Sequence, residues 1–337
     1  MLIDSLLTWA TVAVTLAQEA GQWKVPDNKI RVAFQIGQDG HQGNSGLGGQ
    51  IPTVHIQDVN TRFLAMYYNT GSDWIDAGAN KVIDVDMARS SELWTLSVKM
   101  ENDNTSLDNA VCITYFAWRP EGRMFNVNDR TGAIPGDLFW LCGLDWTYSG
   151  FQVNGTELRC GWLDGDNTTG NSPHIMYLNT DIMGQGFVKD FVQETPGNEI
   201  CEWGVFFARG TSPLKKRSIK DTYGNRAFVT ANGGAIELCD SPTSRGKSML
   251  SLKEGIFCDV LTKTKVPLCR GRKRDGCFKY ERHVDENGRP QRSITFIKPT
   301  STLSTRADFD LTHRSYDLDY FVISDISGRV IDDGTGI

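Results

Sequence analysis

The sequence predicts a mainly β protein, with an antiparallel β-sandwich or jelly roll in the first half and a smaller, disulfide-stapled, β-rich domain in the second. Apolar side chains alternate over short runs, most clearly at Ile30, Val32, Phe34 and Ile36, as half-buried strands require. The 337 residues include 34 Gly and only 11 Pro, at no fixed period, a composition typical of many tight turns between short strands.

Further strands are predicted where runs rich in β-branched and aromatic residues lie between turn clusters. Turns are expected at Asn69–Asp73 and Asp164–Gly170, and the six glycines of Gly37–Gly49 predict a long mobile loop. The predicted strands of the first half are Val54–Ile56, Ile83–Val85, Leu93–Met100, Ala110–Trp118, Leu138–Cys142, Trp146–Val153 and Trp203–Ala208. Those of the second half are Ala227–Thr230, Ser293–Ile297 and Tyr320–Ser324.

Three properties of the sequence change near residue 215. Every Trp after residue 17 lies before residue 204, the net charge changes from −8 over residues 18–217 to +3 over residues 218–337, and the eight cysteines divide four and four. These changes predict a domain boundary. We expect a signal peptide at 1–17, a β-sandwich-like domain at 18–212, a linker at 213–225 and a basic, Cys-containing β-rich domain at 226–337.

The N-terminal segment has the features of a secretory signal peptide. Leu6–Leu16 is largely apolar, and Thr15, Leu16 and Ala17 fit the small-x-small cleavage pattern. The run is shorter than the ~20 apolar residues that a membrane span needs, and a buried N-terminal helix is the alternative. We expect cleavage after Ala17, a secreted, extracellular protein and no transmembrane segment.

The cysteines support secretion independently, because their number is even and oxidised pairs persist outside the cytosol. Zinc binding is the alternative, but no two cysteines are spaced as C-x-x-C. We therefore expect no free thiol, and pairing within each half. The eight residues are Cys112, Cys142, Cys160, Cys201, Cys239, Cys258, Cys269 and Cys277.

Two kinds of processing are predicted. Asn104, Asn154 and Asn167 each precede a Ser or Thr by two residues without an intervening Pro, which is the acceptor pattern for N-glycosylation. The basic pair Lys216 and Arg217 lies at the predicted boundary and fits cleavage by a secretory-pathway convertase. A solvated basic linker is the equally weighted alternative.

No complete catalytic motif occurs in the sequence: H-E-x-x-H, G-x-S-x-G, Walker A and dinucleotide fingerprints are all absent. Without such a fingerprint, no cofactor is predicted. No metal site is predicted either, because the start of a calcium loop at Asp164–Asn167 lacks the later Gly and Glu. A glycosidase needs only two carboxylates across a cleft. Asp145, beside Trp146, and Asp164, near Trp162, are the candidate pair.

Two features are candidates for binding a ligand without catalysing a reaction. Trp74 lies in a turn-like stretch, where an exposed indole can serve as a platform for a sugar ring. Residues 263–298 carry eleven basic and four acidic side chains, a net charge of +7 that attracts anionic surfaces. Within this stretch, Lys273 and Arg274 lie between Cys269 and Cys277. Aromatic residues are sparse there, so no nucleic acid is expected as a partner.

Four short segments, all between residues 109 and 269, resemble recurring segments of uncharacterised secreted proteins of ascomycete fungi, some described as candidate effectors. The resemblance implies a secreted role facing a host or a cell wall and brings no catalytic residues with it. The segments are Asn109–Tyr115 (NAVCITY), Cys160–Asp166 (CGWLDGD), Gly233–Ser244 (GGAIELCDSPTS) and the spacing from Cys258–Asp259 to Pro267–Cys269.

The leading hypothesis is a secreted, glycosylated, disulfide-bonded β protein that recognises an extracellular glycan or an anionic surface and catalyses no reaction. The alternative is a secreted polysaccharide hydrolase that uses a carboxylate pair. A third hypothesis is a proprotein that is cleaved into two chains.

Overall fold

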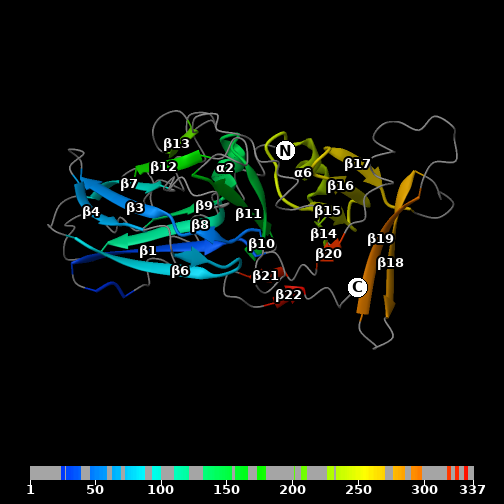
Figure 1. Ribbon diagram of the computed structural model, residues 1–337, viewed down its shortest axis with the longest axis horizontal. Helices are drawn as coiled ribbons and strands as arrows, with labels where there is room; N and C mark the ends of the chain where they lie inside the picture. The colour runs from blue at the N-terminus through cyan, green and yellow to red at the C-terminus, as the bar shows by residue number, and fades with distance from the viewer. Residues whose placement is uncertain are drawn as a thin grey trace.

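The chain folds mainly into antiparallel β-strands in the computed structural model, which confirms the predicted fold class (Figure 1). The strands gather into one large sheet built mainly from the first half with two strands of the second, a five-stranded sheet from the first half, a five-stranded sheet from the second half, and two small ribbons. The structure describes residues 24–26, 28–38, 46–58, 63–69, 73–87, 93–99, 110–120, 132–153, 156–165, 173–179, 201, 206–210, 226–230, 233–269, 276–284, 290–297, 317–319, 323–325 and 330–332.

The largest sheet has eight strands in the order β22-β21-β10-β11-β8-β1-β6, with β9 also paired to β8. All its pairs are antiparallel except β10 with β21, which is parallel. The strands are β1 (Lys29–Ile36), β6 (Asn80–Asp86), β8 (Val111–Pro120), β9 (Gly132–Pro135), β10 (Trp146–Val153), β11 (Thr156–Leu163), β21 (Ile323–Asp325) and β22 (Val330–Asp332).

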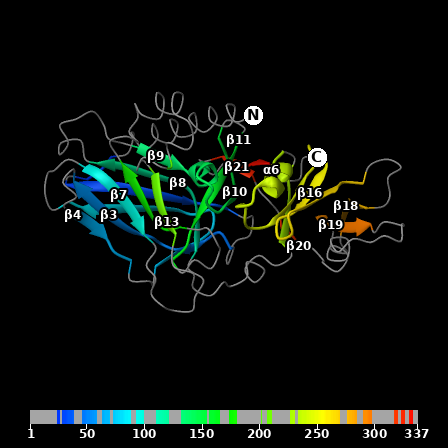
Figure 2. The same cartoon turned by 90° about the horizontal axis from the view of Figure 1, so that it is seen from above.

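A second sheet of five strands lies across the first and has the order β13-β12-β7-β3-β4 (Figure 2). Side chains from both sheets form one buried cluster, in which Val32 and Phe34 of β1 accompany Val54 and Ile56 of β3. The strands are β3 (Thr53–Asp58), β4 (Phe63–Tyr67), β7 (Leu93–Lys99), β12 (Pro173–Asn179) and β13 (Phe206–Gly210), and a small ribbon pairs β2 (Gly49–Gln50) with β5 (Trp74–Ile75).

The second half contributes its own sheet, in the order β17-β16-β15-β14-β20, and a short helix, α6. Phe257 and Phe278 pack in its separate core, with ring centroids 4.3 Å apart. The hairpin of β18 and β19 lies at the end of the molecule away from the first sheet (Figure 1). The elements are β14 (Arg226–Thr230), α6 (Ala235–Asp240), β15 (Ser248–Ser251), β16 (Ile256–Asp259), β17 (Thr264–Pro267), β18 (Cys277–Val284), β19 (Pro290–Ile297) and β20 (Asp317–Asp319).

All eight cysteines form disulfides, and each bond lies within one half of the chain, as predicted. In the first half the two pairs interleave along the sequence, whereas in the second half they follow one another. The bonds are Cys112–Cys160, Cys142–Cys201, Cys239–Cys258 and Cys269–Cys277.

The strand predicted at Leu138–Cys142 is wrong, because Leu138–Leu141 belong to the helix α2 (Asp137–Leu141) and Cys142 caps its end. A short apolar run is compatible with either a buried strand or one face of a helix. The helix lies directly on β11, where Gly161 has no side chain and a Cβ there would be 1.8 Å from the Phe139 ring. The local sequence does not predict this close contact between Phe139 of the helix and Gly161 of β11.

Other boundaries differ by a few residues from the prediction. The strand expected at Trp203–Ala208 continues to Gly210 in β13, and Ile323 and Ser324 of the strand expected at Tyr320–Ser324 belong to β21; residues 203–205 and 320–322 lie outside the described residues. Part of the predicted loop Gly37–Gly49 lies outside the described residues, but Gly49 belongs to β2, where a Cβ would be 2.0 Å from the carbonyl oxygen of Ala110. That close approach, rather than loop flexibility, accounts for this glycine.

Strands from both sides of the predicted boundary near residue 215 share the largest sheet, since β21 pairs with β10. The predicted linker 213–225 and the predicted signal peptide lie outside the described residues. Among the residues that are described, no helix is long and apolar enough to cross a membrane.

Candidate functional site

Trp74 is the large exposed aromatic side chain that the sequence predicted, with half of its surface (50%) open to solvent. It lies on β5, paired with Gln50 of β2. By contrast, Trp118, Trp146 and Trp162 are fully buried. An exposed indole does not contribute to folding the free energy that burial of its apolar area would provide. Trp74 is therefore a candidate contact for a ligand.

The backbone before Trp74 is held by a network around Asn69, which is itself buried. The Asn69 side-chain amide donates to the carbonyl oxygens of Ile51 at 2.6 Å and Asp73 at 3.1 Å, and its oxygen accepts from the Asp73 N–H at 3.3 Å. The Ile51 N–H also donates to the Asp73 carbonyl at 3.0 Å. These bonds fix the position from which the indole projects.

Polar and aromatic residues also lie close to Trp74 in the sequence. The Tyr67 hydroxyl donates to the Asp73 carboxylate at 3.2 Å, and burial together with this hydrogen bond raises the pKa of Tyr67. Tyr68, the next residue, is 55% exposed. We call Tyr67, Tyr68, Asp73 and Trp74 the Trp74 surface. It combines flat apolar rings with a carboxylate acceptor, the two kinds of group that recognise a sugar's CH face and its hydroxyls.

The structure gives the carboxylate pair Asp145 and Asp164 no access to solvent, since both side chains are fully buried. Asp145 forms an ion pair with Arg245 of the second half at 3.3 Å. A glycosidase pair must contact the sugar from opposite sides of an open cleft. The burial of both groups counts against this pair as catalytic residues.

The other predicted site residues fall outside the described residues: Lys273 and Arg274, the sequons Asn104, Asn154 and Asn167, and the cleavage sites at Ala17 and at Lys216 and Arg217. Two described cations of the basic stretch 263–298 form ion pairs within the protein. Lys265 binds Asp240 at 2.6 Å and Lys279 binds Glu281 at 2.5 Å. Of the two acidic partners only Asp240 lies outside the stretch, because Glu281 is already counted in the net charge of +7.

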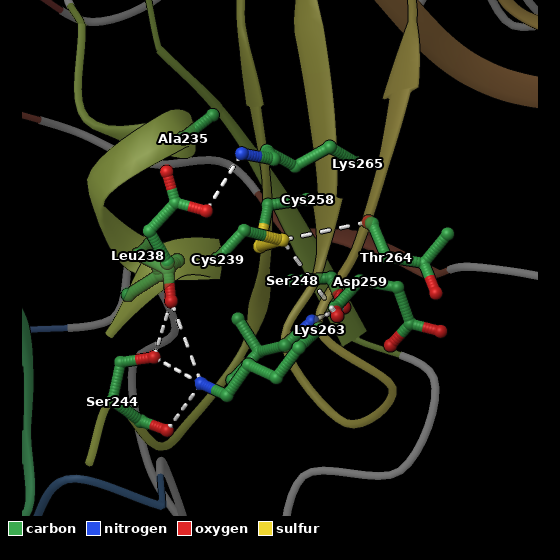
Figure 3. The surroundings of a disulfide bond; sticks show 12 residues. Ala235, Leu238, Cys239, Ser244, Ser248, Cys258, Asp259, Lys263, Thr264 and Lys265 are labelled. Carbon is green, nitrogen blue, oxygen red and sulfur yellow. Dashed lines mark hydrogen bonds and ion pairs between the residues drawn. A yellow bond between two sulfur atoms is a disulfide. The ribbon is translucent and has the colours of Figure 1, made fainter. Parts of the chain in front are cut away.

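Sequence reasoning missed a cluster of Lys263 and Ser244 beside the Cys239–Cys258 disulfide (Figure 3). The Lys263 ammonium donates to the Ser244 hydroxyl, to the Ser244 carbonyl at 2.8 Å and to the Leu238 carbonyl at 3.4 Å. The Ser244 hydroxyl in turn donates to the Leu238 carbonyl. No residue spacing in the sequence predicts this cluster, because a turn between β16 and β17 brings Lys263 to α6.

A serine beside a lysine is a nucleophile and base in some hydrolases. Here Ser244 is fully buried and its proton is engaged by a backbone carbonyl, so no substrate can reach the hydroxyl oxygen. The cation instead lies at the C-terminal end of α6, where it is attracted to the helix carbonyls. Lys263 and Ser244 therefore stabilise the end of α6.

The environment of Lys263 predicts a pH effect on stability. Burial, together with the nearby charge of Arg245, lowers the pKa of its ammonium from 10.5 to about 8 against the opposing charges of Asp145 and Asp259. Between those two pH values the unfolded chain binds a proton that the folded chain has released, so this group stabilises the fold as pH rises. Below pH 8 both states are protonated and its contribution is constant.

We therefore expect the free energy of unfolding of the wild type, measured relative to Lys263→Met by urea denaturation, to increase as pH rises from about 8 to 10.5. Groups that titrate in both proteins cancel in this difference. A difference that stays constant over this range, or that decreases, would contradict the assignment.

Comparison of the chain with models of known protein families and with curated proteins found no match. Within the described residues, no three His, Cys, Asp or Glu side chains gather as metal ligands do. The Trp74 surface is therefore the candidate site, on the basis of its exposure and its fixed backbone.

Proposed function

We propose that this protein is a secreted, glycosylated binding protein that recognises an extracellular glycan through the Trp74 surface and catalyses no reaction. The observation that carries the proposal is the half-exposed Trp74 on a backbone fixed by the Asn69 network. The four disulfides are compatible with an oxidising compartment. The resemblance to secreted proteins of ascomycete fungi supports a wall-facing or host-facing role.

The proposed binding mode follows from the chemistry of sugars. One face of a pyranose ring presents C–H groups that pack on the indole and remove its apolar area from water. The Asp73 carboxylate, which the Tyr67 hydroxyl already contacts, has further acceptor capacity for a sugar hydroxyl. Because the backbone is held before a ligand arrives, little ordering entropy is lost on binding.

The contribution of the indole can be estimated from its exposed area. Half of a Trp side chain is about 100 Å², which at ~25 cal/mol per Å² corresponds to about 2.5 kcal/mol. That free energy is equivalent to a roughly 60-fold change in the dissociation constant.

Trp74→Ala is accordingly expected to weaken binding to insoluble fungal or plant wall polysaccharide by about 10- to 100-fold, while leaving the melting temperature nearly unchanged. The measurement is a pull-down isotherm with the purified full-length protein. Ile236→Ala is the matched control, since Ile236 is an exposed apolar residue (41%) on α6 of the second half. This control should bind like the wild type.

Salt separates the glycan proposal from recognition of an anionic surface. Stacking on Trp74 depends little on ionic strength, whereas attraction to the +7 stretch weakens as the Debye length falls from ~10 Å at 0.1 M to ~3 Å at 1 M. A variant with Lys273→Ala and Arg274→Ala tests that stretch. Loss of binding only in this variant and at high salt would replace the glycan proposal with the anionic surface, and release of sugar without retention would replace it with a hydrolase.

A further inference from the structure

The two halves of the chain share an extensive contact that no disulfide crosses. Each of the four disulfides closes within the first or the second half. We call the contact between Trp146, Tyr148 and Arg159 of the first half and Glu237 and residues 241–245 of the second half the junction. Figure 2 shows α6 and its sheet next to β10 and β11.

Backbone hydrogen bonds make the second half an extension of the largest sheet. The Trp146 N–H donates to the Thr243 carbonyl at 3.2 Å, and the Arg245 N–H donates to the Trp146 carbonyl at 2.8 Å. Further along β10, Phe151 pairs with Ser324 of β21. One edge of β10 pairs with β11, so the second half supplies partners to the other edge at both ends. An open edge there would present unpaired backbone groups.

Charged side chains reinforce the backbone pairing. The Arg159 guanidinium binds both carboxylate oxygens of Glu237, at 2.6 and 2.7 Å, and the Tyr148 hydroxyl donates to the same carboxylate at 2.6 Å. The Arg159 side chain is largely buried. The Asp145–Arg245 ion pair also crosses the junction. In a partly dehydrated contact such charge-assisted bonds are stronger than in water.

Apolar packing across the junction is continuous. One buried cluster contains Leu138 and Trp146 of the first half together with Leu238 and Met249 of the second. The Trp146 indole N–H donates to the Ser241 hydroxyl at 3.0 Å. Gly234 allows the contact, since a Cβ there would be 2.7 Å from the Tyr148 hydroxyl oxygen. Paired backbone, bound charge and shared core are the properties of a permanent interface.

We propose that the second half is a tightly bound partner of the first half, held by the junction, that stays in place when the covalent connection between the halves is cut. Cleavage at the basic run Lys215–Arg217, which the sequence predicts, would then yield a two-chain protein and release no fragment. The interface makes no use of a disulfide, so the two chains of such a protein separate on denaturation without a reductant.

The test cuts the folded protein with its junction residues intact. Residues 215–217 are replaced by the recognition sequence of a site-specific protease, and the purified full-length protein is cleaved without a reductant. We expect native mass spectrometry and size-exclusion chromatography to show one species with the mass of both fragments, which separates in urea. Fragments that separate or precipitate under native conditions overturn the proposal.

A matched pair of variants tests whether the junction holds the halves. In the cleavable protein, Glu237→Gln removes the charge that Arg159 binds but keeps the shape of the side chain. We expect the cleaved fragments to dissociate at least 10-fold faster, or at a correspondingly lower urea concentration. Glu281→Gln makes the same change in a Glu that pairs with Lys279 on the β18–β19 hairpin, and should dissociate like the parent. Equal behaviour of the two variants would show that the charged contacts do not hold the halves together.

Discussion

Replacement of Arg159 by methionine is expected to lower the free energy of unfolding by about 3–5 kcal/mol, because it leaves the buried Asp137 carboxyl without its cation. The guanidinium forms an ion pair with Asp137 and Glu237 and lies 4.4 Å from the Trp140 ring centroid. Burial raises the pKa of Asp137, and the nearby Arg159 opposes that rise. Denaturation in guanidinium chloride measures the loss.

Arg159 keeps its positive charge in the folded protein. Burial alone lowers the pKa of a guanidinium, but the carboxylates of Asp137 and Glu237 that bind it raise the pKa of Arg159 above its ordinary value. Lysine cannot substitute, because a single ammonium does not reproduce the planar fork that contacts two carboxylates at once. We expect Arg159→Lys to recover less than half of the loss.

Arg31→Met is the control for this prediction. Arg31 contacts both carboxylate oxygens of Asp84 at 2.7 Å, but the two side chains remain partly exposed on neighbouring strands of the sheet. An ion pair of that kind contributes about 1 kcal/mol or less. If the two substitutions cost the same, the burial of Arg159 does not matter and the prediction is wrong.

Removal of the Cys112–Cys160 disulfide by the double substitution Cys112→Ala and Cys160→Ala should cost about 4 kcal/mol, the chain-entropy value for a loop of this length. The two cysteines are 48 residues apart, link β8 to β11, and are completely buried with Trp162. The free energy of unfolding from urea denaturation, compared with that of the oxidised wild type, gives the measurement.

The Cys269–Cys277 disulfide supplies the comparison. It spans only 8 residues, for which the same chain-entropy argument gives about 2.5 kcal/mol. Removal of Cys112–Cys160 should therefore lower the free energy of unfolding more than removal of Cys269–Cys277. A larger loss on removal of the short bond would show that local strain or packing, rather than restriction of the unfolded chain, dominates.

The parts of the fold that the sequence predicts are those with a local pattern. Alternation of apolar residues places β1 correctly, a run rich in β-branched and aromatic residues places β10, and the division of the cysteines predicts their pairing within halves. The exposure of Trp74 follows from its turn-like surroundings. The helix α2 does not follow, because its short apolar run also fits a strand.

The contacts of the junction cannot be predicted from local sequence patterns, for a different reason. In β11 the sequence Glu157, Leu158, Arg159, Cys160 alternates polar and apolar residues, a pattern typical of a strand with one face in water. A helix more than 70 residues later in the chain covers that face and supplies Glu237. Likewise, the three residues of β21 show no pattern that would assign them to β10.

If the protein is secreted, as we propose, the order of the disulfides along the chain affects their oxidation during synthesis. In the second half each cysteine bonds to the next one along the chain, so each bond can close as its second cysteine enters the oxidising compartment. In the first half Cys142 emerges before Cys160, the native partner of Cys112. In a secreted chain the nascent first half would therefore have to keep Cys112 reduced, or exchange an early bond, until β11 has been synthesised, and would depend more than the second half on an isomerase.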